Sequence, residues 1–200
     1  MTLPAKKGDV DTPSAIAFTA ASRFFVQAVA ALPPDRYQQP WSGEWRVLDL
    51  VGHGNRANLL PVEYYERPVQ AAGPDYLAEY LLPEKIAERG REATAALGDD
   101  PVAAVRSASD HAVAVIASAP DDAVVGTPFG ERSLDSYLPS RTAELVVHGL
   151  DLDTFVAPPA EALANCGAFL MSQAIDSGRG VDVVRALAGR SALAPGFSVY

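Results

Sequence analysis

The chain has 200 residues, of which 48% are hydrophobic and 20% charged, and its formal net charge is −9. This composition is typical of a folded protein, and the negative charge argues against binding to nucleic acid or to an anionic membrane, which would repel it. Since Cys166 is the single cysteine, an internal disulfide and a thiolate-rich zinc site are both excluded.

The start of the chain carries no sign of export or membrane insertion. Two lysines occur within residues 1–11, but no apolar run like that of a signal peptide follows them. No stretch approaches the roughly 18 uninterrupted apolar residues of a membrane-spanning helix. We therefore expect a cytoplasmic protein folded as a single domain over residues 1–200, with residues 1–11 forming a flexible N-terminus.

Capping residues, prolines and glycines divide the chain into a series of helices. Thr12 can cap a first helix that Pro13 opens and that ends at Pro33-Pro34. The later helices are expected over about 46–65, 74–97 with breaks at Pro83 and Gly90, 101–118, 133–155, 160–177 and 181–188. Between Pro120 and Arg132 we expect a loop with room for a short extended piece.

The expected elements indicate an all-α protein. No run of four to eight residues shows convincing period-two alternation, so little sheet is expected. Long helices joined by proline-marked turns are typical of an antiparallel bundle with its core between facing helices.

Two of the three histidines lie on polar stripes with helical spacing. The first stripe consists of Asp49, His53 and Arg56, and the second of Arg141, Glu144, His148 and Asp151. Each stripe is either a solvated helix face or points inward, where Glu and His at i, i+4 and a histidine from a facing helix would hold one ion. Three such ligands leave positions open for water or substrate, as in catalytic zinc sites. Spacing alone leaves both interpretations open.

Two motifs decide between these interpretations by resemblance. The segment EWRVLDLVGH, residues 44–53, resembles the second-helix motif of the mycothiol-dependent maleylpyruvate isomerase family, within the DinB-like superfamily. RTAELVVHGLDL, residues 141–152, resembles its fourth-helix motif, and ALAGR, residues 186–190, resembles the chain end of its single-domain members. The resemblance covers essentially the whole chain.

The resemblance implies both a fold and a site. The fold is a DinB-like antiparallel four-helix bundle with extra short helices, in which the second and fourth long helices face each other. The metal ligands of the family fall on His53, Glu144 and His148. The ion is expected to be zinc, with nickel and manganese as alternatives, and mycothiol is the implied cofactor or co-substrate.

A divalent metal together with mycothiol implies a particular kind of reaction. A metal with open positions binds a thiol as its thiolate and supplies a nucleophile at neutral pH, so no protein nucleophile is expected. We predict S-transfer to, or isomerisation of, a small electrophilic substrate, with a homodimer compatible with the sequence. Characterised isomerases carry a further C-terminal α/β domain that contributes to the active site. Since 200 residues leave no room for it, transfer of the thiol to another electrophile is at least as well supported as maleylpyruvate isomerisation.

Further polar residues have two interpretations each. Asp49 and Asp151 lie one turn from a ligand histidine and either hold the imidazole as hydrogen-bond acceptors or are ordinary helix acids. Arg56 and Arg141 either bind a carboxylate of thiol or substrate or belong to the bundle surface. His111 and Cys166, which lie outside both motifs, are expected to be structural, Cys166 as a small buried residue.

Two other functions are compatible with the same residues. One is a hydrolase that uses a metal-bound hydroxide. The other is a non-catalytic metal or small-ligand binding protein, such as a stress protein. Polar groups in a pocket beside the metal would favour catalysis, whereas an ion sealed by apolar side chains would favour a structural role.

Overall fold

The computed structural model describes residues 12–199, and the expected flexible segment 1–11 lies outside them. In chain order the helices are α1 (Pro13–Ala30), α2 (Val47–Glu66), α3 (Pro74–Tyr80), α4 (Pro83–Ala95), α5 (Pro101–Ser118), α6 (Leu134–Asp151), α7 (Ala160–Asp176) and α8 (Gly180–Leu187). A short 3-10 helix spans Pro34–Arg36. The strands are β1 (Pro40–Ser42), β2 (Trp45–Arg46), β3 (Val124–Thr127) and β4 (Gly130–Ser133). The prediction of a mostly helical DinB-like bundle is confirmed.

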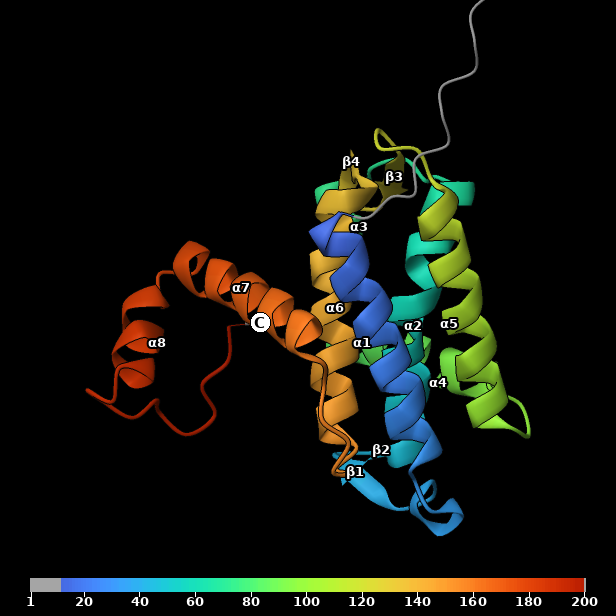
Figure 1. The fold of residues 1–200 in the computed structure, drawn as a ribbon, viewed down its shortest axis with the longest axis horizontal. Helices are drawn as coiled ribbons and strands as arrows, with labels where there is room; N and C mark the ends of the chain where they lie inside the picture. The colour runs from blue at the N-terminus through green and yellow to red at the C-terminus, as the bar shows by residue number, and fades with distance from the viewer. Residues whose placement is uncertain (1–11, 200) are drawn as a thin grey trace, which may run out of the picture.

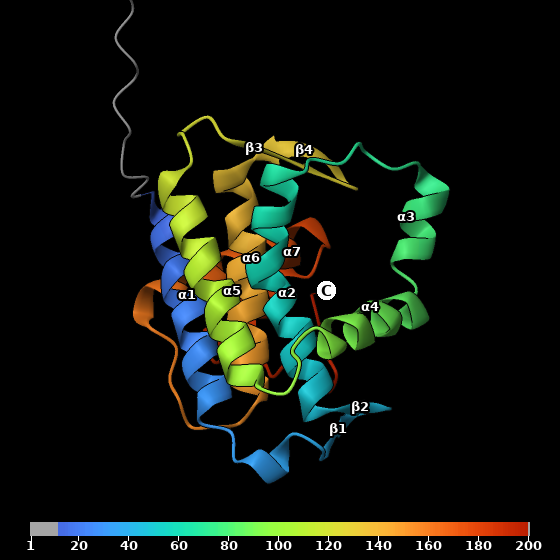
Figure 2. The same cartoon turned by 90° about the vertical axis from the view of Figure 1, so that its right-hand side faces the viewer.

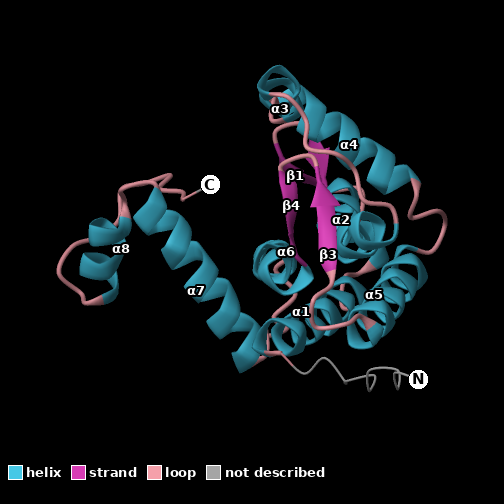
Figure 3. Cartoon of the chain, turned by 90° about the horizontal axis from the view of Figure 1, so that it is seen from above, coloured by secondary structure: helices cyan, strands magenta, loops and turns pink. Residues whose placement is uncertain are grey.

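Four long helices, α1, α2, α5 and α6, form the bundle (Figures 1 and 3). Each packs against two neighbours, in the order α1, α6, α2, α5 and back to α1. The predicted second and fourth long helices are α2 and α6, and they do pack against each other. Aromatic and branched side chains such as Phe18, Phe25, Leu50 and Leu145 are fully buried between the four helices.

The predicted antiparallel arrangement holds for two of the four neighbouring helix pairs of the bundle. In Figure 1, α1 and α6 run downward while α2 and α5 run upward. The pairs α2–α6 and α1–α5 are therefore antiparallel, whereas α1–α6 and α2–α5 are parallel. The reason is the segment α3–α4, which returns the chain from the upper end of α2 to the lower end of the bundle before α5 begins (Figure 2).

The ends of the bundle helices follow the predicted capping signals. Thr12 accepts a hydrogen bond from the Ala15 amide at 3.1 Å and donates to Asp135 of α6 at 2.5 Å. Ser133 caps α6 by accepting from the Ser136 amide. The predicted end of this helix near Phe155 is wrong, because α6 stops at Asp151. Asp153 and Phe155 both have positive φ, a backbone conformation incompatible with a continuing helix.

Two short hairpins close the bundle at its opposite ends (Figure 1). The hairpin β3–β4 pairs Val124 with Ser133 and Thr127 with Gly130, and it contains the extended piece expected within 120–132. The hairpin β1–β2 was not expected, because strands of three and two residues are too short to show alternation. It turns at Gly43, whose φ is +57°.

The remaining helices project from the bundle on different sides. Helices α3 and α4 extend to one side (Figure 2), with α4 packed against α2. Helix α7 packs against α6 and α1 and then leaves the bundle, carrying α8 at its far end (Figure 1). None of the helices within residues 12–199 is both long enough and apolar enough to cross a membrane.

Candidate metal centre

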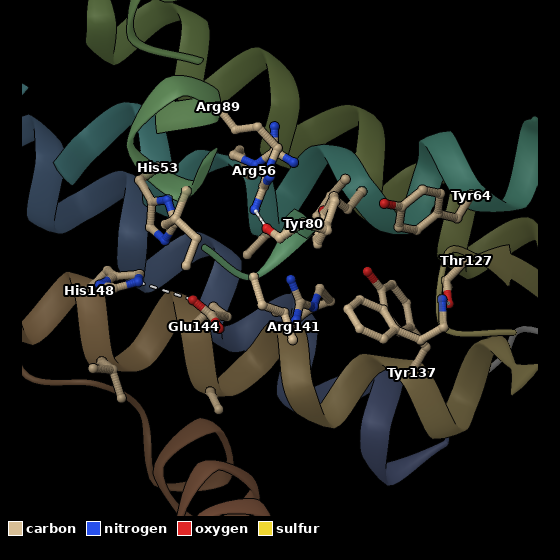
Figure 4. Close-up of a pocket in the computed structure, with 17 residues that line it drawn as sticks. His53, Arg56, Tyr64, Tyr80, Arg89, Thr127, Tyr137, Arg141, Glu144 and His148 are labelled. Carbon is tan, nitrogen blue, oxygen red and sulfur yellow. Dashed lines mark hydrogen bonds and ion pairs between the residues drawn. The ribbon is translucent and has the colours of Figure 1, made fainter. Parts of the chain in front are cut away.

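Helices α2 and α6 bring the three predicted ligands together. His53 projects from α2, while Glu144 and His148 project from α6 one turn apart, as their i, i+4 spacing requires (Figure 4). One ligand atom from each of the three residues lies within 4.8 Å of the other two. Within residues 12–199 they form the one group of three or more His, Cys, Asp or Glu residues with such spacing. The three ligands of the polar stripes thus face one another between α2 and α6, while Asp151 at the end of the second stripe is exposed.

Glycines allow α2 and α6 to pack closely on α1 at this level, and one of them also allows α2 to approach α6. A Cβ atom on Gly54 of α2 would lie 2.6 Å from the Phe25 ring and 3.3 Å from Cβ of His148. A Cβ atom on Gly149 of α6 would lie 2.4 Å from the Phe24 ring. Both rings belong to α1 and both distances are shorter than van der Waals contact, so a side chain at Gly54 would push α2 away from α1, and one at Gly149 would push α6 away from α1. At Gly54 it would also crowd His148 of α6.

The ligand side chains already contact one another. Nε2 of His148 lies 3.0 Å from Oε2 of Glu144, and Nδ1 of the same ring lies 3.3 Å from Oδ2 of Asp151. The His53 ring centroid is 5.0 Å from that of His148, with the two rings at 76°. The geometry therefore offers two imidazoles and one carboxylate to a common point.

The environment gives the three ligands different charges. Burial, together with the positive charge of His148, lowers the pKa of His53 and favours the neutral imidazole. Burial disfavours protonation of His148, but its hydrogen bonds to Asp151 and Glu144 outweigh this effect and raise its pKa to about 9. Burial likewise opposes ionisation of Glu144, yet the hydrogen bond with His148 and the charge of Arg141 hold its pKa below the usual range.

This set of donors fits a divalent ion. Two imidazole nitrogens and a carboxylate oxygen are the usual ligands of zinc and similar metals. Among the described residues, Nδ1 of His53 is buried and has no hydrogen-bond partner, which is costly unless something else satisfies it. An ion held by the three side chains would require His148 to give up its proton.

The two predicted supporting acids occupy different positions. Asp151 contacts His148 and can hold that imidazole in a fixed orientation, as proposed from the sequence. Asp49 instead accepts hydrogen bonds from the backbone amide and the guanidinium of Arg46, at 2.9 to 3.0 Å. The structure thus gives Asp49 the alternative role of a first-turn acid that caps α2.

A cavity of about 630 Å³ opens beside the three ligands. His53, Glu144 and His148 lie at one end, Tyr64, Tyr137 and Thr127 lie at the other, and Arg56, Arg141 and Tyr80 lie between (Figure 4). The two predicted arginines therefore lie in the same cavity as the metal ligands and come from facing helices. Arg141 lies over the Tyr137 ring, 5.2 Å from its centroid.

Sequence reasoning missed the tyrosines and the wall of the cavity. Tyr64 and Tyr137 continue the two predicted stripes, since Tyr64 is eleven residues after His53 and Tyr137 eleven before His148. Extending each stripe by further turns would have found them. Tyr80 and Arg89 come from α3 and α4 and had no such signal. The Arg89 guanidinium lies 3.7 Å from the Tyr80 ring centroid and donates to the Tyr80 carbonyl.

The two residues expected to be structural lie away from the cavity. Cys166 is buried in α7, as predicted, and burial raises the pKa of its thiol. His111 is exposed on α5 and does not line the cavity. Neither residue belongs to the candidate centre.

Comparison with known families gives one match. Residues 18–153 match the model of the family described as mycothiol maleylpyruvate isomerase N-terminal domain. The matched segment contains the four bundle helices apart from the first five residues of α1, and it includes all three candidate ligands. Searches of curated proteins and of solved structures gave no significant match.

Proposed function

Since the chain belongs to the mycothiol maleylpyruvate isomerase N-terminal domain family, we propose that it is a metal-dependent enzyme that uses mycothiol to transfer sulfur to, or to isomerise, a small electrophilic substrate. The observation that carries this proposal is the convergence of the ligand atoms of His53, Glu144 and His148 to within 4.8 Å at one end of a cavity. Zinc is the proposed ion, with nickel and manganese as alternatives that accept the same ligands.

The ion and the protein have separate tasks in this proposal. A divalent ion held by these three residues would bind the thiol as its thiolate and so provide a nucleophile at neutral pH. The protein fixes the three ligands on two closely packed helices, and Asp151 orients the His148 ring. In S-transfer the sulfur bonds to an electrophilic carbon of the substrate, which either loses a leaving group or takes up a proton.

The two arginines are suited to hold an anionic group beside the reacting centre. Arg56 follows His53 by three residues on α2, and Arg141 precedes Glu144 by three residues on α6, so both guanidinium groups lie in the cavity next to the ligands (Figure 4). Hydrogen bonds between a guanidinium and a carboxylate are stronger than those between neutral groups. We therefore propose that Arg56 and Arg141 bind a carboxylate of the substrate or of the thiol.

The surroundings of the ligands support catalysis over a purely structural metal site. A structural zinc is closed by four protein ligands, whereas three protein ligands leave a position open. Here the three residues line a cavity together with three arginines and three tyrosines, which would give a thiol or substrate room beside an ion held there. A hydrolase would use the same residues without the thiol, so dependence on mycothiol separates these two activities.

Calorimetric titration tests the proposal. Mycothiol is added to zinc-loaded protein and to chelator-treated protein, in two buffers of different ionisation enthalpy. We expect tight binding only with zinc, with release of about one proton at pH 7, because a free thiol with a pKa near 8.5 is mostly protonated. S-methyl mycothiol is the matched control, since it cannot form a thiolate. Equal binding to metal-free protein without proton release would refute the proposed role of the metal.

A further inference from the structure

His53 and His148 are held in the centre by different kinds of contact. His148 has carboxylates at both ring nitrogens, Glu144 at 3.0 Å and Asp151 at 3.3 Å. Neither ring nitrogen of His53 makes a hydrogen bond among the described residues, and Nδ1 is also buried, so whichever nitrogen takes the ion, the other has no partner to orient the ring. Metal-binding histidines are usually oriented by a hydrogen bond from the second ring nitrogen. The orientation of His53 must therefore depend on packing.

Trp45 provides that packing. It lies in β2, immediately before α2, and its ring centroid is 5.1 Å from that of His53 with the rings at 68°. This edge-to-face arrangement is a favourable geometry for aromatic rings. Trp45 does not line the cavity, so it contacts the metal ligand without belonging to the surface that a substrate would touch.

Helix α4 holds the indole in place. Gly90 is the one buried residue of Pro83–Ala95, and a Cβ atom there would lie 3.1 Å from the Trp45 ring. One turn further along α4, the backbone of Thr94 approaches Gly52 of α2, where a Cβ atom would lie only 2.6 Å away from the Thr94 amide nitrogen. The contact between Thr94 and Gly52 packs α4 against α2, and the contact at Gly90 holds the Trp45 indole between Gly90 and His53.

We infer that Trp45 is a positioning residue of the candidate metal centre: its indole, backed by Gly90, holds the His53 imidazole in the orientation that meets Glu144 and His148. The inference rests on the proposed metal site and extends it to two residues that contact neither the ion nor the substrate cavity. Gly90 does not contact His53 itself, because Trp45 lies between them. A side chain added at Gly90 should therefore alter metal binding by displacing the indole of Trp45.

Cobalt(II) titration of the full-length chain tests this inference, because the visible absorption of bound cobalt reports the arrangement of its ligands. The variants are Trp45→Leu, Trp45→Phe and Gly90→Ala, with Trp41→Phe as the matched control. Trp41 lies on the same hairpin, 6.2 Å from the Trp45 ring, and is 39% exposed. Folding of each variant is followed by circular dichroism during thermal unfolding.

We expect Trp45→Leu to weaken cobalt binding about tenfold and to change the absorption spectrum, as loss of a ligand's supporting partner does. Trp45→Phe should restore part of the affinity, and Gly90→Ala should change the spectrum in the same direction without lowering the unfolding temperature. The inference is overturned if Trp45→Leu and Gly90→Ala bind cobalt with the affinity and spectrum of Trp41→Phe. Absence of cobalt binding by the unaltered chain would overturn the metal site and this inference together.

Discussion

The two sides of the cavity are built in different ways. The side formed by α2 and α6 consists of long helices that pack on each other and, through Gly54 and Gly149, closely on α1, and it carries all three candidate metal ligands. The side formed by α3 and α4 consists of shorter helices in which, over residues 74–95, only Gly90 is buried. Tyr80 and Arg89 reach the cavity from this second side.

The difference indicates a division of tasks between the two sides. Metal ligands need fixed positions, which a tightly packed helix pair provides. Side chains on short, exposed helices are held by few buried contacts and can adjust to a small molecule. Changes to residues packed between α2 and α6 should therefore affect metal binding or stability, whereas changes to the cavity side chains Arg56, Arg141, Tyr80 and Arg89 should affect only the small ligand.

The largest expected effect is loss of the metal. His53→Ala and His148→Ala should each lower zinc affinity by at least about 100-fold, because two remaining ligands cannot hold the ion against solvent. Elemental analysis after dialysis measures zinc per chain, and His111→Ala is the control because His111 is exposed on α5. Full zinc content in both ligand variants would contradict the assignment.

Gly149→Ala tests the close packing of α6. Its Cβ atom would lie 2.4 Å from the buried Phe24 ring, and we expect a loss of about 1–3 kcal/mol in the free energy of unfolding. Gly167→Ala on α7 is the matched control, since no atom lies within 4 Å of its Cβ position, and it should stabilise by about 0.5–1 kcal/mol. Urea unfolding measures both values. The same effect from both changes would disprove the tight packing at Gly149.

Arg56→Gln and Arg141→Gln should separate ligand binding from metal binding. Zinc content should stay unchanged, while the Kd for the thiol or the KM of an anionic substrate rises about tenfold for the arginine that binds it. Arg106→Gln on α5 is the control, since Arg106 is exposed and outside this cavity. Unchanged Kd and KM in both arginine variants would show that neither residue binds the ligands tested.

The pH dependence of metal binding should correspond to the loss of one proton from His148. The hydrogen bonds of Asp151 and Glu144 raise the pKa of His148 to about 9, so below that pH a proton competes with the ion for this ring. Zinc affinity should therefore increase by about tenfold per pH unit between pH 6 and 8 from this group. Asp151→Asn should weaken zinc binding about tenfold and make the pH dependence shallower. Competition with a chromophoric chelator measures both, and a pH-independent affinity would exclude this coupling.

Residues on long periodic helices were the ones that the sequence could identify. His53, Glu144, His148, Arg56 and Arg141 were found because helical spacing and two motifs placed them on stripes that meet. The bounds of α2 and α5 were also predicted to within one residue. For Asp151 the one-turn separation from His148 left two roles open, and the structure shows the contact between them.

Other features depend on contacts between distant segments. Asp49 has the spacing to support His53, but the neighbouring Arg46 competes for its carboxylate. Tyr80 and Arg89 enter the cavity because α4 packs on Gly52 of α2 and, through Gly90, on Trp45 of β2, contacts that helical periodicity does not reveal. The early end of α6 depends on the positive φ of Asp153 and Phe155. Glycine is the usual sequence signal for a positive φ, and neither residue is a glycine.

Locating the ion itself would decide between the proposed centre and every alternative. Crystals grown with one equivalent of zinc, measured at the zinc absorption edge, give an anomalous difference map that shows each bound ion. We expect one strong peak per chain between α2 and α6, about 2.0–2.2 Å from an imidazole nitrogen of His53, an imidazole nitrogen of His148 and a carboxylate oxygen of Glu144. An occupied zinc site elsewhere, with no peak among these three residues, would contradict the metal centre and the function proposed from it.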